Sequence, residues 1–360
     1  MAERRILTRS ICAKFHNSLY GQSIFSPCPL LKNYPLDILF LNAQHSMGEM
    51  VVDAQYTNKR RRRVKLIFNP VSGANRGAPV KLMDVIKELQ AWKLVPEPYL
   101  TEPDSDFSAV VNEAVTQGIH MFVACGGDGT VSAVARAMPD TGATLGIIPT
   151  GTQNNIAYSL GIPADIPAAI AVLRTGKRDK IDMGIATCGN TSTPFFEICS
   201  VGLFSALFES GDRIQHGDIT RIGDLLSTLT ASPPSKIRLL LNGKHEIKNT
   251  GHVVLVSNMP FIGRRYQMAP PGSFRDGFLD VLFCSDIPKL NLMVKYILKV
   301  HGNKADDPRI MNFRVRKILI ETNPAMAVMA DGICLGEGSV SIEIRRGALP
   351  VIVPDSSIVN

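Results

Sequence analysis

The sequence lacks a run of apolar residues long enough for a membrane-spanning helix. Such a helix needs roughly 18 or more consecutive apolar residues. The nearest candidate, FFEICSVGLFSALFE at residues 195–209, is shorter and contains Glu197. The chain also starts without the apolar core of a secretory signal. Any contact with a membrane is therefore expected to be peripheral.

The cysteines lack the spacing of zinc sites and of disulfide-rich proteins. All seven are scattered singly, with no Cys-x-x-Cys pair and no Cys/His cluster at zinc spacing. An odd, dispersed set is typical of a reducing compartment, so we expect a cytoplasmic protein. Most of these side chains are predicted to be small, buried apolar groups. They are Cys12, Cys28, Cys125, Cys188, Cys199, Cys284 and Cys334.

The excess of positive charge is concentrated in the first 63 residues. The net charge is +7, and residues 1–63 hold ten Lys/Arg against four Asp/Glu. This segment is predicted to be a poorly structured basic leader. Its final run, NKRRRR, either attracts an anionic membrane surface or nucleic acid, or is simply solvated. Basic residues interleaved with aromatic ones are missing, and Trp92 is the single tryptophan. We therefore expect no nucleic-acid partner.

From residue 64 onward the sequence becomes regular, and 360 residues suffice for two domains. Between residues 64 and 180, a strand, a polar loop and a helix follow one another four times. This order predicts an α/β domain with a doubly wound, mostly parallel sheet, whose ligands bind at the carboxyl ends of the strands. Asp106 is expected to cap a helix. The predicted strands cover 64–68, 119–125 and 143–149, with a short one before Thr101, and the helices cover 80–92, 107–116, 131–138 and 156–161.

Residues 181–353 change to a pattern of strands. Asn242-Gly243 predicts a hairpin, and FRVRKILIETN at 313–323 predicts a single strand. One predicted helix, over 290–300, interrupts them. We predict an antiparallel β-sandwich or barrel-like domain, with residues 354–360 as a tail. The cleft between the two domains is the preferred place for a ligand.

The loop Gly126-Gly127-Asp128-Gly129-Thr130 carries the clearest chemistry. Glycines after a buried strand let backbone amides approach an anion closely. Thr130 is expected to cap the helix that follows, whose positive end favours phosphate. Asp128 would repel phosphate unless it holds Mg²⁺ or polarises an attacking hydroxyl. The alternative is a tight turn in which Asp128 caps its neighbours. The loop matches neither the Walker A pattern nor GxGxxG.

The other predicted strands of this domain also end in polar loops. Each loop alone is ordinary turn composition, but four at one sheet edge indicate a nucleotide phosphate site. In the second domain, Asp276 either caps its turn or binds a hard cation together with backbone carbonyls, and Asp331-Gly332 predicts a hairpin turn. The loop residues are Asn69, Ser72 and Gly73 after the first strand, Thr101 after the second, and Thr150, Gly151, Thr152 and Asn154 after the fourth.

Taken in order, the motifs NPVSG, GGDGT, PTGTQNN, APPGSFRDGFLDV and ADG resemble the diacylglycerol kinase catalytic domain family, in particular its bacterial soluble lipid kinases. Sphingosine kinases and, remotely, NAD kinases share the glycine-Asp loop. The resemblance extends from Val64 to Val353. It implies transfer of the γ-phosphate of ATP to the hydroxyl of a diacylglycerol-like lipid, as in phospholipid biosynthesis, by a homodimer that contacts the membrane peripherally.

The resemblance also implies roles for particular residues. Asp128, with a catalytic Mg²⁺, would orient the phosphates, and Asp331 would face it from the second domain. A structural Mg²⁺ would bind the carboxylate of Asp276 and the backbone carbonyls of Ser273 and Phe278. The residues that the resemblance assigns to ATP are Asn69, Ser72, Thr101, the loop Gly126–Ser132 with Val131 and Ser132 at its end, and Thr152.

The sequence departs from the family pattern at several positions. Where the family has Asp-Gly-Glu, whose glutamate is a candidate general base, position 333 is Ile333. Glu337 would substitute for it only if the loop were shifted. Two alternatives therefore stay open: a catalytically weak or inactive member that binds nucleotide or lipid, and a small-molecule kinase of the NAD kinase type. The other departures are Ala133, Gln153-Asn154-Asn155, Arg264 and Arg265.

Overall fold

The computed structural model describes residues 61–73, 80–202, 234–262, 266–270, 272–285 and 309–355. The predicted leader lies outside these ranges except for its last three residues. Most of the predicted tail, the helix predicted over 290–300, and Arg264 and Arg265 also lie outside them. These described residues belong to one compact unit. Among the described residues, no helix is long and apolar enough to cross a membrane.

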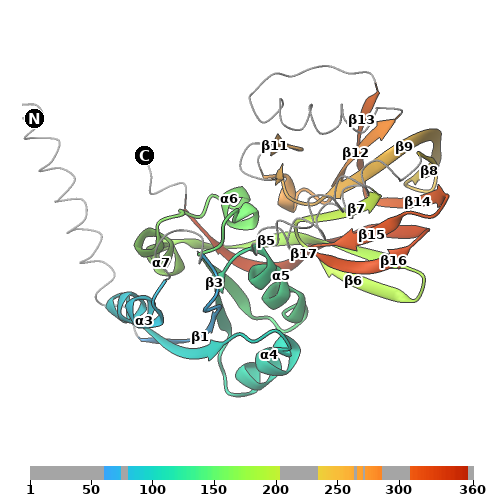
Figure 1. Ribbon diagram of the computed structural model, residues 1–360. Coiled ribbons are helices and arrows are strands. Elements are labelled where there is room, and N and C mark those ends of the chain that lie inside the picture. The colour runs from blue at the N-terminus through green and yellow to red at the C-terminus, as the bar shows by residue number, and fades with distance from the viewer. Residues whose placement is uncertain are drawn as a thin grey trace, which may run out of the picture. The chain divides into compact units, whose positions relative to one another are not determined.

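In the first half of this unit, the described residues form four strands and five helices (Figure 1). The strands are β1 (Arg62–Phe68), β2 (Leu94–Leu100), β3 (Met121–Gly126) and β4 (Thr144–Pro149). The helices are α3 (Leu82–Ala91), α4 (Phe107–Thr116), α5 (Asp128–Ala137), α6 (Asn155–Ser159) and α7 (Ile166–Thr175). The strands lie in the order β2-β1-β3-β4, and every neighbouring pair is parallel.

The alternation of side chains along β3 explains why helices cover both faces of this sheet. Phe122 and Ala124 lie in one hydrophobic core with residues of α4, α5 and α6. Met121 and Val123 point to the opposite face and lie in a second core with residues of α3 and α7. Because both faces are covered, β3 is buried along its whole length. The predicted doubly wound α/β domain is confirmed.

One predicted helix start is confirmed, a second is wrong, and one helix was not predicted. The Asp106 carboxylate accepts a hydrogen bond from the Ala109 N–H (3.0 Å) and caps α4, as predicted. The expected cap at Thr130 is wrong, because α5 begins at Asp128 and Thr130 lies inside its first turn. Helix α7 has no counterpart among the predicted elements, although Asp165 caps it and a proline stands in its first turn.

The second half is antiparallel and β-rich, as predicted. The Asn242-Gly243 hairpin is confirmed, since both residues adopt positive φ (51° and 67°) between two paired strands. The predicted single strand over 313–323 is two strands that join different neighbours. The strands are β5 (Lys177–Cys188), β6 (Thr191–Phe195), β7 (Ile198–Gly202), β8 (Ser235–Leu241), β9 (His245–Ser257), β10 (Phe261–Ile262), β11 (Tyr266–Gln267), β12 (Leu279–Ser285), β13 (Ile310–Val315), β14 (Lys317–Asn323), β15 (Ala327–Ala330), β16 (Ile333–Glu337) and β17 (Val340–Val353), with a 3-10 turn at Ser273–Arg275.

Two long strands join the halves. β5 and β17 pair antiparallel along most of their length, and Val351 near the end of β17 pairs in parallel with Leu145 of β4. Ile181 and Val351 lie in the same hydrophobic core as Phe122. The predicted boundary between residues 180 and 181 therefore falls inside a strand that both halves share. This shared pair holds the carboxyl ends of the first four strands opposite the second half.

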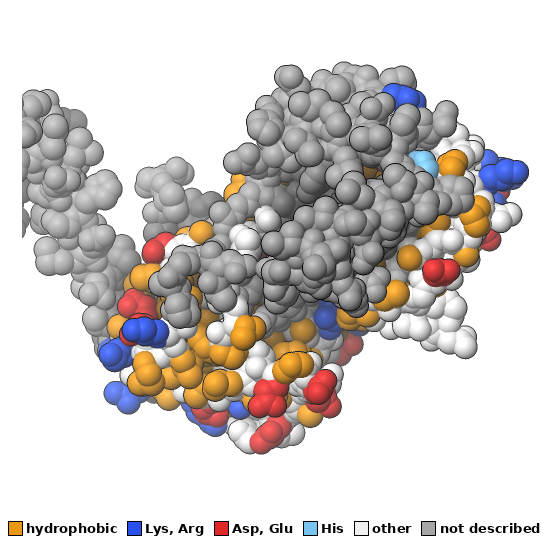
Figure 2. Space-filling view, viewed as in Figure 1, with side chains coloured by type: hydrophobic (Ala, Val, Ile, Leu, Met, Phe, Trp, Pro, Cys, Tyr) orange, Lys and Arg blue, Asp and Glu red, His pale blue; other side chains and the backbone are white. Residues whose placement is uncertain are grey.

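The surface charge of the described residues is mixed. Figure 2 shows one face on which acidic and basic side chains are interspersed with hydrophobic ones. This mixture is expected, because most of the net charge of +7 comes from residues 1–63, and nearly all of those lie outside the described ranges.

The cap of α4 allows a direct test of this account of helix starts. We expect Asp106→Ala to lower the free energy of unfolding by about 1 kcal/mol, because the amide of Ala109 loses its acceptor. Asp104→Ala removes an exposed carboxylate from the same loop and should have little effect. Urea denaturation of both variants measures the difference, and equal effects would contradict the assignment of the cap.

Candidate active site

The loops that follow β1, β3 and β4 are tied to one another by side-chain hydrogen bonds. Asn69 Nδ2 donates to Thr130 Oγ1 (2.9 Å), which links the first loop to the start of α5. Thr150 Oγ1 donates to Ser72 Oγ (2.9 Å), which links the first loop to the one after β4. Thr101 follows β2 and donates its N–H to the carbonyl of Phe68 (2.9 Å). The structure therefore brings the predicted nucleotide loops together at one sheet edge.

Two glycines are required where these loops touch. A Cβ at Gly151 would lie 2.3 Å from the Cα of Gly127, so position 151 does not tolerate a side chain. Gly73 has a positive φ of 78°, and its Cβ would lie 2.5 Å from the carbonyl oxygen of Thr150. The contacts leave a concentration of bare backbone at the sheet edge. Such an arrangement suits a phosphate group, which backbone N–H groups bind closely.

The remaining loop residues occupy different environments. Val131 is buried in the hydrophobic core, so only its backbone can face a nucleotide. Thr152 and Gly129 are exposed. Asn154 is buried in the left-handed conformation (φ 55°), and its Nδ2 donates to the carbonyl of Gly151 (2.8 Å).

Asp128 stands at the start of α5 and is held by the start of α6. Its Oδ1 accepts a hydrogen bond from the N–H of Ile156 (3.0 Å). Burial raises the pKa of Asp128, and the charge of Asp331 raises it further, while the backbone N–H groups of Asn154, Asn155 and Ile156 oppose the shift. The carboxylate is thus fixed in direction by the loop that follows β4.

Asp331 joins the site from the second half. It occupies the turn between β15 and β16, which confirms the predicted hairpin turn. Its Oδ2 accepts from Ser132 Oγ of α5 (3.0 Å) and from the Phe196 N–H (2.7 Å). Its Oδ1 accepts from the N–H groups of Glu197 (3.0 Å) and Ile198 (2.9 Å). Burial raises the pKa of Asp331, while the donors Phe196, Ile198 and Ser132 and the charge of Arg136 oppose the shift.

Glu197 is a third carboxylate of this site and was not among the predicted residues. It lies between β6 and β7, is buried, and accepts a hydrogen bond at Oε1 from Asn155 Nδ2 (2.6 Å). Burial raises the pKa of Glu197 well above its usual value, and the charges of Asp128 and Asp331 add to the shift. The signal in the sequence was a lone carboxylate inside an apolar run, since a buried charge needs a partner.

The carboxylates of Asp128, Glu197 and Asp331 do not by themselves form a metal site. Among the described residues, no group of three or more His, Cys, Asp or Glu side chains could hold a metal ion alone. Mg²⁺ commonly takes one or two protein carboxylates and completes its shell with substrate phosphates and water. Asn154 Oδ1 and Asn155 Oδ1 are buried beside these carboxylates and have no hydrogen-bond partner. These observations fit a nucleotide that brings Mg²⁺ with it.

Neither position 333 nor Glu337 supplies the carboxylate that the family has as a candidate general base. Ile333 packs against the hydrophobic core of the second half. Glu337 ends β16, opposite Ala327, and is exposed. The described carboxylates that influence one another across the halves are therefore Asp128, Glu197 and Asp331.

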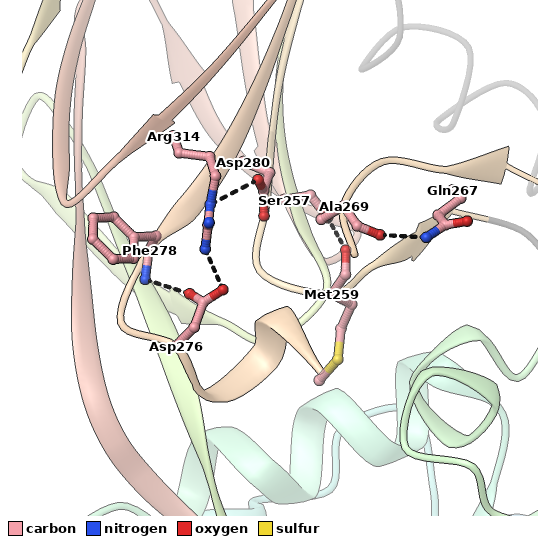
Figure 3. A network of polar contacts seen from close by, with 8 residues as sticks. All are labelled: Ser257, Met259, Gln267, Ala269, Asp276, Phe278, Asp280 and Arg314. Atoms are coloured by element: carbon pink, nitrogen blue, oxygen red, sulfur yellow. Dashed lines mark hydrogen bonds and ion pairs between the residues drawn. The ribbon is translucent and has the colours of Figure 1, made fainter. Parts of the chain in front are cut away.

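The predicted structural metal ligands lie on one turn, where Arg314 already supplies a cation (Figure 3). The Asp276 carboxylate accepts from the Phe278 N–H (2.9 Å) and forms an ion pair with Arg314. Arg314 Nε also lies 3.5 Å from Asp280 Oδ1, and its guanidinium is 4.9 Å from the centre of the Phe278 ring. Burial raises the pKa of Asp280 to about 6, although Arg314 opposes the shift.

This arrangement suits the guanidinium better than Mg²⁺. Both oxygens of the Asp276 carboxylate have partners, and the Ser273 carbonyl accepts the Asp276 N–H (3.2 Å). A divalent cation would have to displace Arg314 against charge repulsion. The structural Mg²⁺ stays a prediction, and no step of the reaction proposed below depends on it.

Comparison with known proteins gives two family matches along the chain. Residues 63–186 match the diacylglycerol kinase catalytic domain, and residues 213–353 match the YegS C-terminal NAD kinase beta sandwich-like domain. The chain belongs to the diacylglycerol kinase catalytic domain family. Membership of this family supports a general assignment of the protein as a lipid kinase.

Individual proteins of known sequence or structure resemble this diacylglycerol kinase family member over most of its length. It is 26% identical over 310 residues to an uncharacterized protein of Synechocystis sp., covering 80% of this chain and 70% of that protein. It is 26% identical to a diacylglycerol kinase of Mycobacterium tuberculosis, covering 81% of this chain and 95% of the relative. A crystal structure of a diacylglycerol kinase from Bacillus anthracis has the same fold, with a TM-score of 0.62, 18% identity, and coverage of 84% of this chain and 100% of that chain.

The contact between the two glycine loops predicts a matched pair of variants. Gly151→Ala should lower the free energy of unfolding by about 1–3 kcal/mol, because its Cβ overlaps backbone that cannot move aside. Gly129→Ala has open space around its Cβ and should be neutral or stabilising by up to about 1 kcal/mol. Thermal or urea denaturation gives both values. A neutral Gly151→Ala would show that the loops are not in contact.

The Arg314 ion pairs predict how the turn responds to metal. Chelation with EDTA should leave the melting temperature of the wild type unchanged. Arg314→Met should lower the free energy of unfolding by about 1 kcal/mol, since the side chain is 47% exposed, and Mg²⁺ should restore part of that loss. Lys244→Met, which removes an exposed cation from another turn, is the control. A fall in the wild-type melting temperature with EDTA would mean that a metal binds despite Arg314.

Proposed function

We propose that this protein is an ATP- and Mg²⁺-dependent lipid kinase that transfers the γ-phosphate to the hydroxyl of a diacylglycerol-like lipid. The observation that carries the proposal is the hydrogen bond from Ser132 to Asp331. It brings a carboxylate of the second half to the glycine loop of the first, where Asp128 stands. Relatives named diacylglycerol kinase that cover most of this chain support the same reaction.

Each loop has a part in positioning the nucleotide. Phosphoryl transfer depends mainly on alignment and on neutralising charge at the transferred group. The backbone around Gly73, Gly127 and Gly151 would bind phosphate oxygens, with Asn69, Ser72, Thr101 and Thr152 beside them. Asp128, held by the start of α6, would orient the γ-phosphate and help to receive the proton of the acceptor hydroxyl. When bound, Mg²⁺ would neutralise charge on the phosphates.

The second half would hold the lipid, and Asp331 would face the reacting groups from it. A lipid acceptor requires contact with a membrane, which we expect to be peripheral for a cytoplasmic enzyme. We also expect a homodimer. Membrane contact and dimerisation are proposals about the partners of the protein, and the proposed chemistry does not depend on them.

A second candidate function is a member that binds nucleotide or lipid with little or no turnover. It is favoured by Ile333, which packs against the hydrophobic core of the second half and stands where the family has a candidate base. Loss of a general base typically costs about 10²- to 10⁴-fold, and phosphoryl transfer through a loose transition state depends on a base less strongly. The kinase is therefore the preferred assignment.

Transfer of labelled γ-phosphate from ATP across a panel of lipid alcohols tests the proposal. The wild type should label at least one lipid, and Asp128→Ala should lower the rate by about 10²- to 10⁴-fold. Asp104→Ala is the control for loss of an acidic charge. NAD, included as an acceptor, tests the small-molecule alternative.

Two results would contradict the lipid kinase. ATP-dependent thermal stabilisation without transfer to any lipid would favour the binding-only protein. In that case Ile333→Glu should create activity. Transfer to NAD in preference to every lipid would favour the small-molecule kinase.

A further inference from the structure

Glu197 is anchored in the second half and reaches the first. Its backbone N–H donates to Asp331 Oδ1 (3.0 Å), and its carbonyl accepts from the N–H of Asn258 (3.0 Å). Asn258 is itself fixed, because its Nδ2 donates to the carbonyls of Asp182 (2.9 Å) and Phe196 (3.0 Å). The Glu197 carboxyl group therefore projects from a rigid base.

The partner of that carboxyl group is the first residue of α6. Asn155 Nδ2 donates to Glu197 Oε1 over 2.6 Å. The next residue, Ile156, donates its N–H to Asp128 Oδ1 over 3.0 Å. One short helical turn thus connects Glu197 in the second half to Asp128 in the first.

The other side of this turn is fixed within its own loop. Asn154 is in the left-handed conformation and donates Nδ2 to the carbonyl of Gly151 (2.8 Å). A helix of five residues has little stability of its own. Its direction therefore depends on contacts such as the one with Glu197.

We propose that Glu197 is a positioning residue of the phosphoryl-transfer site, whose carboxyl group holds Asn155 and thereby fixes the start of α6 and the carboxylate of Asp128. This inference rests on the proposed kinase function for its kinetic consequences. Its structural consequence, the placement of α6, is independent of any acceptor.

The environment of Glu197 favours this role over that of a charged base. Its burial, with Asp128 and Asp331 nearby, raises its pKa and favours the neutral acid. Glutamine has the shape of that acid and keeps a carbonyl oxygen for Asn155. The amide oxygen of Asn155, Oδ1, is buried without a hydrogen-bond partner, as Asn154 Oδ1 is. Unpaired buried acceptors at this point indicate that the turn meets a polar ligand.

The kinetic test compares variants that keep or lose the acceptor oxygen. Glu197→Gln should stay within about threefold of the wild-type kcat, whereas Glu197→Ala should lower kcat by about 10- to 100-fold, because small misplacements near the reacting groups carry such costs. The KM for ATP should change less than about threefold in both. Glu337→Ala, which removes an exposed carboxylate from β16, should not change either constant.

A double-mutant cycle with Asn155 identifies the route of the effect. Asn155→Ala should resemble Glu197→Ala, and the double variant should lose no more than either single variant, because both remove the same contact. Additive losses would overturn the proposal. A Glu197→Gln variant as slow as Glu197→Ala would also overturn it, since the charge rather than the contact would then matter.

Crystal structures of the unliganded variants separate this inference from the proposed function. In Glu197→Ala the start of α6 should shift and the Ile156 N–H should leave Asp128, while Glu197→Gln should keep both in place. An unchanged α6 in Glu197→Ala would overturn the positioning role whatever the enzyme phosphorylates. Failure of the wild type to label any lipid would overturn the kinase but leave this structural outcome intact.

Discussion

The carboxylate of Asp331 is the contact on which the site depends. It collects three backbone N–H groups of the second half and the hydroxyl of Ser132 on α5. Hydrogen bonds to an ionised acceptor are stronger than neutral ones. Because the donors come from both halves, this one side chain fixes the glycine loop against the start of β7. The paired strands β5 and β17 make that placement possible by running through both halves.

A second constraint is the accumulation of negative charge. Burial raises the pKa of Asp128, Glu197 and Asp331; the charge of Asp331 also raises that of Asp128 and Glu197, and the charge of Asp128 raises that of Glu197. Such a cluster is costly without a cation or a proton. Perturbed carboxyl groups beside loops of bare backbone mark a candidate functional site.

Local patterns in the sequence were sufficient for much of the fold. The hydrophobic run of β3, the Asp106 cap and the Asn242-Gly243 turn each follow from short-range rules, and all three are confirmed. Convergence of the polar loops also follows from their place after parallel strands. The start of α5 at Asp128 was missed because Thr130, a good cap by type, instead accepts from Asn69.

Contacts between residues that lie far apart in the chain could not be predicted from the sequence. Glu197 was read only as a charge that interrupts an apolar run, since its partner Asn155 lies 42 residues away. Arg314 lies 38 residues from Asp276, so nothing local predicted that a guanidinium would reach the proposed metal ligands. The break of the predicted strand over 313–323 has the same origin, because its two parts pair with different strands.

The central claim is that the carboxylate cluster and the glycine loops form one site for a metal-bound nucleotide. A crystal structure with a non-hydrolysable ATP analogue and Mn²⁺, located by its anomalous signal, tests this claim most directly. We predict the terminal phosphate on the backbone of Gly126–Ser132 and Gly151–Asn154, with Mn²⁺ between the phosphates and Asp128. A nucleotide bound elsewhere, or one bound at these loops with no metal near Asp128, would contradict the account.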